Sequence, residues 1–193
     1  MNGFAAAIVG YICIVLDLVL REALKIGPAG SAGAAPSFVL PFVVFVALYS
    51  PQLTALWTAL IMGLIIDLLT PRGAEAIVVA GPHALGFAAA AYFVLTVRSM
   101  LVRRNPLVLV VLSVVGMAIA QLVVVSLLSF RAFYPDPVTW RPLRELTDRM
   151  VASFYTAGSA LVLSVVLWPL IPLMGFADPQ ARRGVVGGQT RRH

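Results

Sequence analysis

The strongest constraint on this chain is a long stretch without charge. No Asp, Glu, Lys or Arg occurs between Pro36 and Ile66. A transmembrane helix needs about 20 apolar residues, so this stretch is too long for one span. Pro51 lies near its middle, and proline ends a helix because it lacks an N–H and its ring clashes with the preceding turn. The sequence SPQ at 50–52 therefore predicts a tight hairpin between two apolar helices.

The rest of the chain is just as apolar. Hydrophobic residues make up 61% of it and charged residues 11%, with a mean hydropathy of +0.97, whereas soluble domains carry about 25% charged residues. We therefore expect an all-α integral membrane protein with one domain, residues 1–176, folded as a bundle of six transmembrane helices. The expected helices cover residues 4–20, 36–49, 51–70, 82–97, 106–129 and 151–176. No Lys or Arg precedes the first run, so we expect a retained helix rather than a cleaved signal peptide.

Two polar segments lie outside these runs. Near 139–150, Trp140, Leu143, Leu146 and Met150 recur at helical spacing with charged residues between them. This pattern predicts a short amphipathic helix at the periplasmic side of the membrane, with an irregular polar loop as the alternative. Residues 177–193 are rich in Gly and Arg, which predicts a basic, disordered cytoplasmic tail.

The net charge of +6 has its source in basic residues between the apolar runs. They are read as topology determinants and as contacts for lipid headgroups. No basic patch is interleaved with aromatic residues, so no nucleic acid is expected as a partner. With six spans, Lys and Arg number seven on each side. The dense groups at 98–105 and in the tail favour cytoplasmic termini.

Asp67 stands out in the apolar sequence LIIDLL at 64–69. A stripe of residues four apart leads to it, formed by Ala55, Ala59 and Gly63. Small residues at this spacing let helices approach closely, which would direct Asp67 into the bundle. An ionisable group within a span indicates a functional role by default. The alternative is a structural role near the helix end, with the carboxylate bonded to backbone or to Arg72.

Three further polar residues are expected at a similar depth toward the outer leaflet: Asp17, His83 and Gln121. Asp17 is placed to pair with Arg21 one turn later. A carboxylate and an imidazole at one depth can act as base and acid, although a structural hydrogen bond is the favoured reading. The single cysteine, Cys13, is read as a small buried residue. The sequence has no metal-ligand spacing and no nucleotide-binding loop, so no cofactor is expected.

The middle of the chain shows an ordered set of motifs. They are APSFVLPFVVFVALY at 35–49, the turn SPQ, MGLIIDLL at 62–69 with Gly63 and Asp67, GPHALGF at 81–87, AAAAYFVL at 88–95 and VRSMLVRR at 97–104. In order and spacing this region resembles the bacterial rod shape-determining protein MreD family. The loop PRGAEAIVVA at 71–80 is longer than is usual in that family, which affects the alignment of His83.

The resemblance implies a non-enzymatic inner-membrane component of the cell-elongation machinery. Such a protein supports lateral peptidoglycan synthesis and rod shape. Its implied partners are MreC, the glycosyltransferase RodA, a class B penicillin-binding transpeptidase and the actin-like MreB. The family's fold is similar to that of the substrate-binding subunits of energy-coupling-factor vitamin transporters, six-helix bundles with a cavity at the outer side.

Three functions follow from these observations. The first is a scaffold in which Asp67 fixes the bundle or a docking site. The second is a substrate-binding subunit of a vitamin transporter, whose pocket would use Asp17, Asp67, His83, Gln121 and Trp57. The third is a membrane enzyme acting on a lipid-linked substrate with Asp67 and His83, for which the sequence offers least support.

Overall fold

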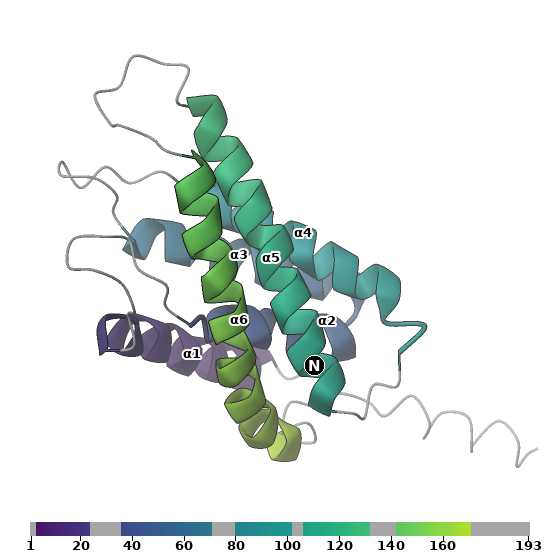
Figure 1. Ribbon diagram of the computed structural model, residues 1–193. Helices are drawn as coiled ribbons and strands as arrows, with labels where there is room; N and C mark the ends of the chain where they lie inside the picture. Colours follow the sequence, from purple (N-terminus) through teal and green to yellow (C-terminus); the bar gives the residue numbers. More distant parts are fainter. Residues whose placement is uncertain (1–2, 24–35, 71–79, 102–105, 132–141, 171–193) are drawn as a thin grey trace, which may run out of the picture.

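The computed structural model describes residues 3–23, 36–70, 80–101, 106–131 and 142–170, and these residues are helical apart from short turns (Figure 1). The helices are α1 (Gly3–Ala23), α2 (Val39–Tyr49), α3 (Gln52–Leu69), α4 (Pro82–Val97), α5 (Pro106–Arg131) and α6 (Pro142–Leu167), followed by a 3-10 turn at Trp168–Leu170. The predicted all-α class is confirmed.

Within the described parts of the chain, three helices are long and apolar enough to cross a membrane. Their apolar stretches are Gly3–Leu20, Gln52–Leu69 and Leu107–Phe130. The other apolar helical stretches are shorter, and α2, with 11 residues, extends only about 16 Å. A bilayer's hydrocarbon core is about 30 Å thick, so α2 cannot cross it unaided. The helices are those of a membrane protein, and the full set of six spans stays a prediction.

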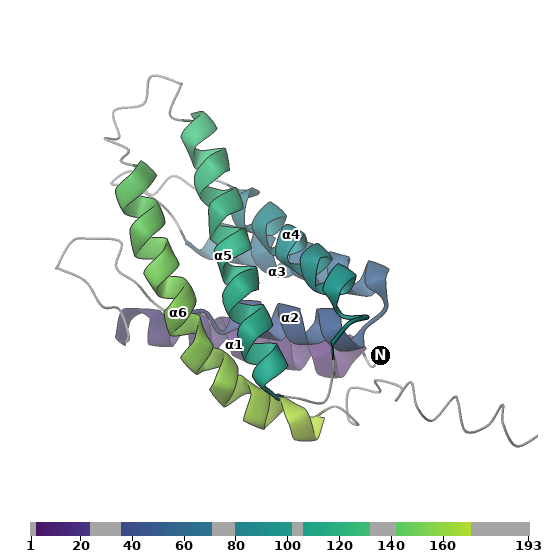
Figure 2. The same ribbon diagram turned by 45° about the vertical axis from the view of Figure 1, so that its right-hand side comes forward.

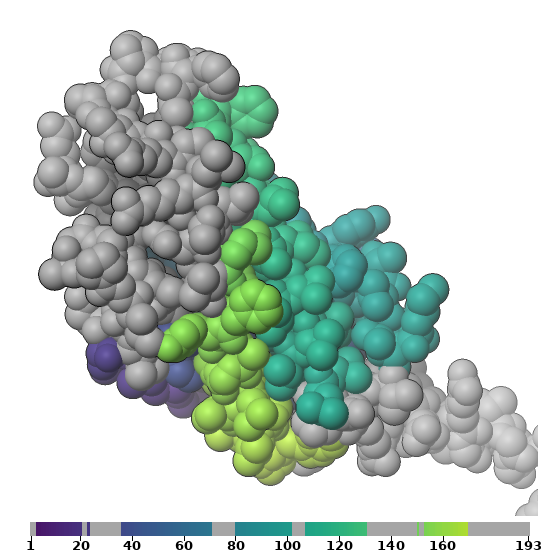
Figure 3. All heavy atoms as spheres, viewed as in Figure 1, coloured from purple at the N-terminus to yellow at the C-terminus, as the bar shows by residue number. Residues whose placement is uncertain are grey.

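The helices pack as neighbours along the chain. α5 packs against both α4 and α6, and α4 packs against α3, whereas α1 packs chiefly against α2. Figures 1 and 2 show α5 and α6 as a long pair that crosses α1 and α2 steeply. Figure 3 shows α4, α5 and α6 side by side on one face of the molecule.

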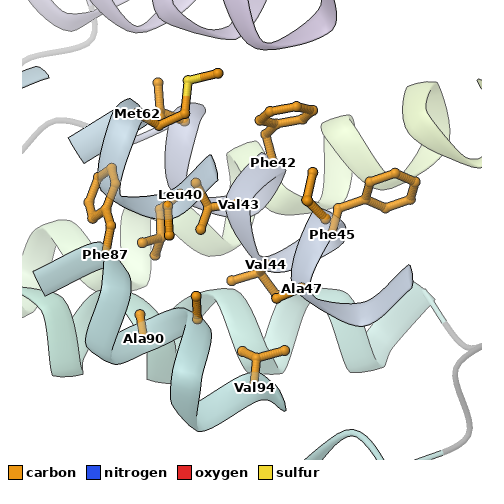
Figure 4. Packing of buried hydrophobic residues seen from close by; sticks show 14 of the residues in the cluster. Leu40, Phe42, Val43, Val44, Phe45, Ala47, Met62, Phe87, Ala90 and Val94 are labelled. Atoms are coloured by element: carbon orange, nitrogen blue, oxygen red, sulfur yellow. The ribbon is translucent and has the colours of Figure 1, made fainter. Parts of the chain in front are cut away.

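The short helix α2 is the centre of the core. Every residue from Val39 to Leu48 is buried, and its side chains meet those of α3 and α4, as Phe42, Met62 and Phe87 show in Figure 4. The inside of a helix satisfies its own backbone hydrogen bonds, but the first N–H groups and the last carbonyls have no partner within it. In apolar surroundings those two ends must find partners on neighbouring elements.

The turn between α2 and α3 is as short as the sequence indicates. α2 ends at Tyr49 and α3 begins at Gln52. The Ser50 N–H donates to the Val46 carbonyl (2.8 Å), and the Ala55 N–H donates to the Pro51 carbonyl (3.0 Å). The predicted hairpin is confirmed, with Pro51 at the position where one helix stops and the next begins.

The last helix differs from its predicted bounds. α6 begins at Pro142 and continues without a break to Leu167, so residues 142–150 form its first turns, and residues 139–141 lie outside the described residues. Proline suits a first helical position, and the helix continues through Gly158 without a break. Pro169 ends the α-helical pattern because it has no N–H to donate. The interfacial placement of 139–150 stays a prediction, and residues 171–193 lie outside the described residues.

Candidate functional site

The carboxylate of Asp67 closes the first turn of a neighbouring helix. Asp67 belongs to α3, yet its oxygens accept hydrogen bonds from the backbone N–H groups of Gly81 (2.9 Å), His83 (3.0 and 3.2 Å) and Ala84 (3.2 Å) at the start of α4. The residue is 1% exposed. These are N–H groups that a helix leaves unpaired at its N-terminus, where the helix dipole also favours negative charge.

The sequence at the start of α4 explains why the cap comes from elsewhere. Helices usually begin with Ser, Thr, Asp or Asn, whose side chain accepts from the second or third N–H. Here that position is Gly81, which has no side chain and adopts φ +121°. Pro82 follows and has no N–H of its own. Asp67 thus supplies from α3 the acceptor that α4 lacks.

His83 adds a side-chain bond to the same carboxylate. Its Nδ1 lies 2.7 Å from Asp67 Oδ1, and its ring meets the ring of Phe87 edge-on, with centroids 6.1 Å apart. With Nδ1–H donating, the imidazole is held in one orientation. The pair is thus a buried hydrogen bond within a helix cap, and proton transfer by it stays a prediction.

The stripe of small residues brings α3 and α4 together. Ala55 and Ala59 have no exposed surface, and a Cβ added at Gly63 would lie 2.5 Å from the Ala84 Cα and 2.5 Å from the His83 carbonyl oxygen. Only a glycine permits this approach. Because Gly63 stands one turn before Asp67, it sets the distance at which the carboxylate reaches the first turn of α4.

Asp17 has the equivalent place at the start of α2. Its Oδ1 accepts from the Phe38 N–H at 2.7 Å, and Asp17 is 1% exposed. The neighbouring Ser37 N–H donates to Thr156 Oγ1 (3.3 Å), and the Ser159 hydroxyl donates to the Ser37 carbonyl (2.6 Å). The predicted partner Arg21 has a side chain outside the described residues.

The other end of α2 is closed by Arg98. Its Nη1 donates to the carbonyls of Ala47 (2.9 Å) and Ser50 (2.7 Å). The sequence suggested only a topology role for Arg98, because nothing local shows that a residue 48 positions away is its partner. With Asp17 at its N-terminal end and Arg98 at its C-terminal end, the buried helix has opposite charges that complement its dipole.

The two aspartates follow one design that the sequence analysis missed. IVLDLVL at 14–20 and LIIDLLT at 64–70 each carry an aspartate late in an apolar helix. Asp17 caps the start of α2 and Asp67 the start of α4, and a proline stands close by in both cases, with Pro36 two residues before Phe38 and Pro82 directly before His83. The shared sequence pattern was a usable signal, although the loops between differ in length.

Of the remaining predicted residues, Gln121 lies near the start of α4 and Trp57 lies in the first half of α3. Gln121 of α5 is buried, with its amide nitrogen 3.8 Å from the sulfur of Met117. It follows Ala120, whose carbonyl oxygen would lie 2.8 Å from a Cβ at Gly86, one turn into α4. Trp57 is 58% exposed. Within the described parts of the helices, no cluster of three His, Cys, Asp or Glu residues is placed to hold a metal ion.

Comparison with known proteins now places the chain. A family model described as rod shape-determining protein MreD matches residues 3–174, which include all of these caps. The chain belongs to this family. The family determines rod shape as part of the cell-shape machinery, and it is a structural component rather than a known enzyme family. Comparisons with curated proteins and with solved structures found no match.

Proposed function

We propose that this chain is a non-enzymatic scaffold of the cell-elongation machinery in the bacterial inner membrane, with both termini in the cytoplasm. It assembles with MreC, RodA and a class B penicillin-binding transpeptidase, and so supports lateral peptidoglycan synthesis. Family membership gives the cell-shape role. The scaffold mechanism is our inference from the way the buried charges are used.

This mechanism rests on one observation: the Asp67 carboxylate is already fully used in hydrogen bonds within the protein. Four donors from the first turn of α4 converge on it. A carboxylate held by backbone N–H groups would have to break a helix cap before it bound a substrate. Removing one member of such a buried set leaves the others unpaired in apolar surroundings, which suits a residue that holds a shape.

The scaffold needs outer faces on which partners dock. On α3 the side opposite the Ala55–Asp67 stripe carries exposed apolar residues, among them Leu53 (70% exposed), Trp57 and Ile61 (52%). Within a bilayer such a face contacts lipid or the membrane helix of another protein. Asp67 and Gly63 fix how α3 lies on α4, and thereby fix where this face points.

The vitamin-carrier alternative has no comparable support. It requires Asp67 and the four other residues named for it (Asp17, His83, Gln121 and Trp57) to line a common pocket. Asp17 and Asp67 instead bind the backbone of two different helices, and Trp57 lies on the outer face. We therefore retain one proposed function.

The test is recovery of the assembly from native membranes. The tagged chain is expressed in a rod-shaped host that depends on it, extracted in mild detergent, purified and analysed by mass spectrometry. We expect MreC together with RodA and its transpeptidase. Trp57→Ala examines the outer face of α3, with Tyr92→Ala, at an exposed aromatic position of α4, as the control. Recovery of ATPase subunits in place of these partners would contradict the proposal.

A further inference from the structure

An apolar groove of about 500 Å³ separates α1 from α6. One wall is formed by Ile12 and Leu16 of α1, the other by Val162 and Val166 of α6, and Phe38 lies between them. The two helices cross steeply in Figures 1 and 2. Steeply crossed helices cannot stay in contact along their lengths, so a wedge of space is left beside the crossing.

The chemistry of the walls excludes water as the filling. Of the polar side chains at the groove, the Ser159 hydroxyl binds the Ser37 carbonyl and the nearby Asp17 binds the Phe38 N–H, while Tyr155 adds one hydroxyl to the lining. A buried water needs about three polar partners, and walls that are apolar apart from the hydroxyls of Tyr155 and Ser159 do not provide them. In a membrane the groove is therefore filled by something apolar.

The size of the groove decides what that is. The groove, at about 500 Å³, has the size of a small-ligand pocket, whereas a transmembrane helix about 10 Å wide and 30 Å long could enter it only in part. A single aliphatic chain is narrow enough to lie within it. We propose that the groove between α1 and α6 binds one acyl chain of a membrane phospholipid, which completes the packing of α1 on the bundle.

Gly158 offers a way to fill the groove without disturbing the fold. It lies in the groove wall, and a Cβ added there meets no atom within 4 Å. Gly158→Phe should occupy the space with its own ring. Leu161→Phe is the matched control, since Leu161 is 54% exposed on the same helix and lies outside the groove wall.

The experiment is photolabelling of the full chain in nanodiscs of phosphatidylethanolamine and phosphatidylglycerol. A trace of phosphatidylcholine carries a diazirine on its acyl chain, and labelled peptides are mapped by mass spectrometry. We expect label to concentrate on α1 and α6 at the groove relative to the exposed face of α3. Gly158→Phe should reduce groove labelling to the level of α3, and Leu161→Phe should leave it unchanged.

Two results would overturn the proposal. One is groove labelling in the parent chain that does not exceed the labelling of α3, a comparison that needs no variant. The other comes from a photoreactive amino acid at Val162 in native membranes: crosslinking to a second polypeptide there would make the groove a protein-docking surface. Either result would leave the proposed scaffold function standing, because that function rests on the caps and on α3.

Discussion

Gly63 of α3 and Ala84 of α4 approach so closely that a Cβ on Gly63 would lie 2.5 Å from the Ala84 Cα. The contact lies between two backbones, so no side-chain rotation can relieve it. The same approach sets the position of Asp67, one turn further along α3, against the Ala84 N–H. Helix packing and helix capping are therefore coupled at this point.

Gly63→Ala should separate the two helices and weaken the cap together. Overpacking of this kind costs about 1–3 kcal/mol of folding free energy, so we expect a lower unfolding temperature in detergent. Gly158→Ala is the control, since it is also helical and has open space at its Cβ. That change should be neutral or stabilising because alanine favours a helix over glycine. Equal unfolding temperatures for Gly63→Ala and the parent would show that the close approach has no energetic consequence.

Arg98→Met should destabilise the C-terminal end of α2. The change keeps much of the apolar stem but removes the hydrogen bonds from Nη1 to the Ala47 and Ser50 carbonyls. Hydrogen bonds to charged groups contribute about 1.5–3 kcal/mol, so a loss of about 2 kcal/mol is expected from thermal unfolding. Arg98→Lys should restore part of the lost stability, because the lysine ammonium keeps the positive charge but lacks the planar guanidinium that can donate to both carbonyls. Ser99→Ala, at an exposed neighbouring position, should unfold at the parent temperature. A similar loss of stability in Ser99→Ala would show that the effect does not come from the Arg98 hydrogen bonds to the two carbonyls.

The sequence was sufficient for the bounds of α2, α3 and α4, but not for those of α6 or for the caps that the helices provide for one another. Apolar runs and prolines located α2, α3 and α4 to within three residues, because helix period and proline chemistry are local properties. The stripe ending in Asp67 likewise followed from spacing. Arg98 could not be assigned in this way, because its acceptors belong to a helix distant in sequence. The identity of the donors for Asp67 also depends on how the loop before Gly81 returns to α3.

Asp17→Leu should loosen the start of α2. Without the carboxylate, the Phe38 N–H loses its acceptor at 2.7 Å, and hydrogen exchange measured by mass spectrometry should become faster in the peptide that covers the first turn of α2. Loss of a cap costs about 1–2 kcal/mol, which corresponds to roughly a tenfold change in an opening equilibrium. Asp17→Asn keeps one acceptor and should show a smaller effect. Leu18→Ala, at the adjacent and partly exposed position, should leave that peptide unchanged; if all three variants exchange alike, Asp17 is not the cap.

The central claim is that Asp67 is a structural anchor on which assembly depends. The most direct measurement compares Asp67→Ala with the parent for unfolding temperature and for the MreC recovered per folded molecule from the same membranes. Removing a partner from a buried charged network costs about 3 kcal/mol. The account predicts that stability and partner recovery fall together, with loss of rod shape in the host. An Asp67→Ala chain that unfolds at the parent temperature, recovers MreC fully and supports rod shape would contradict it.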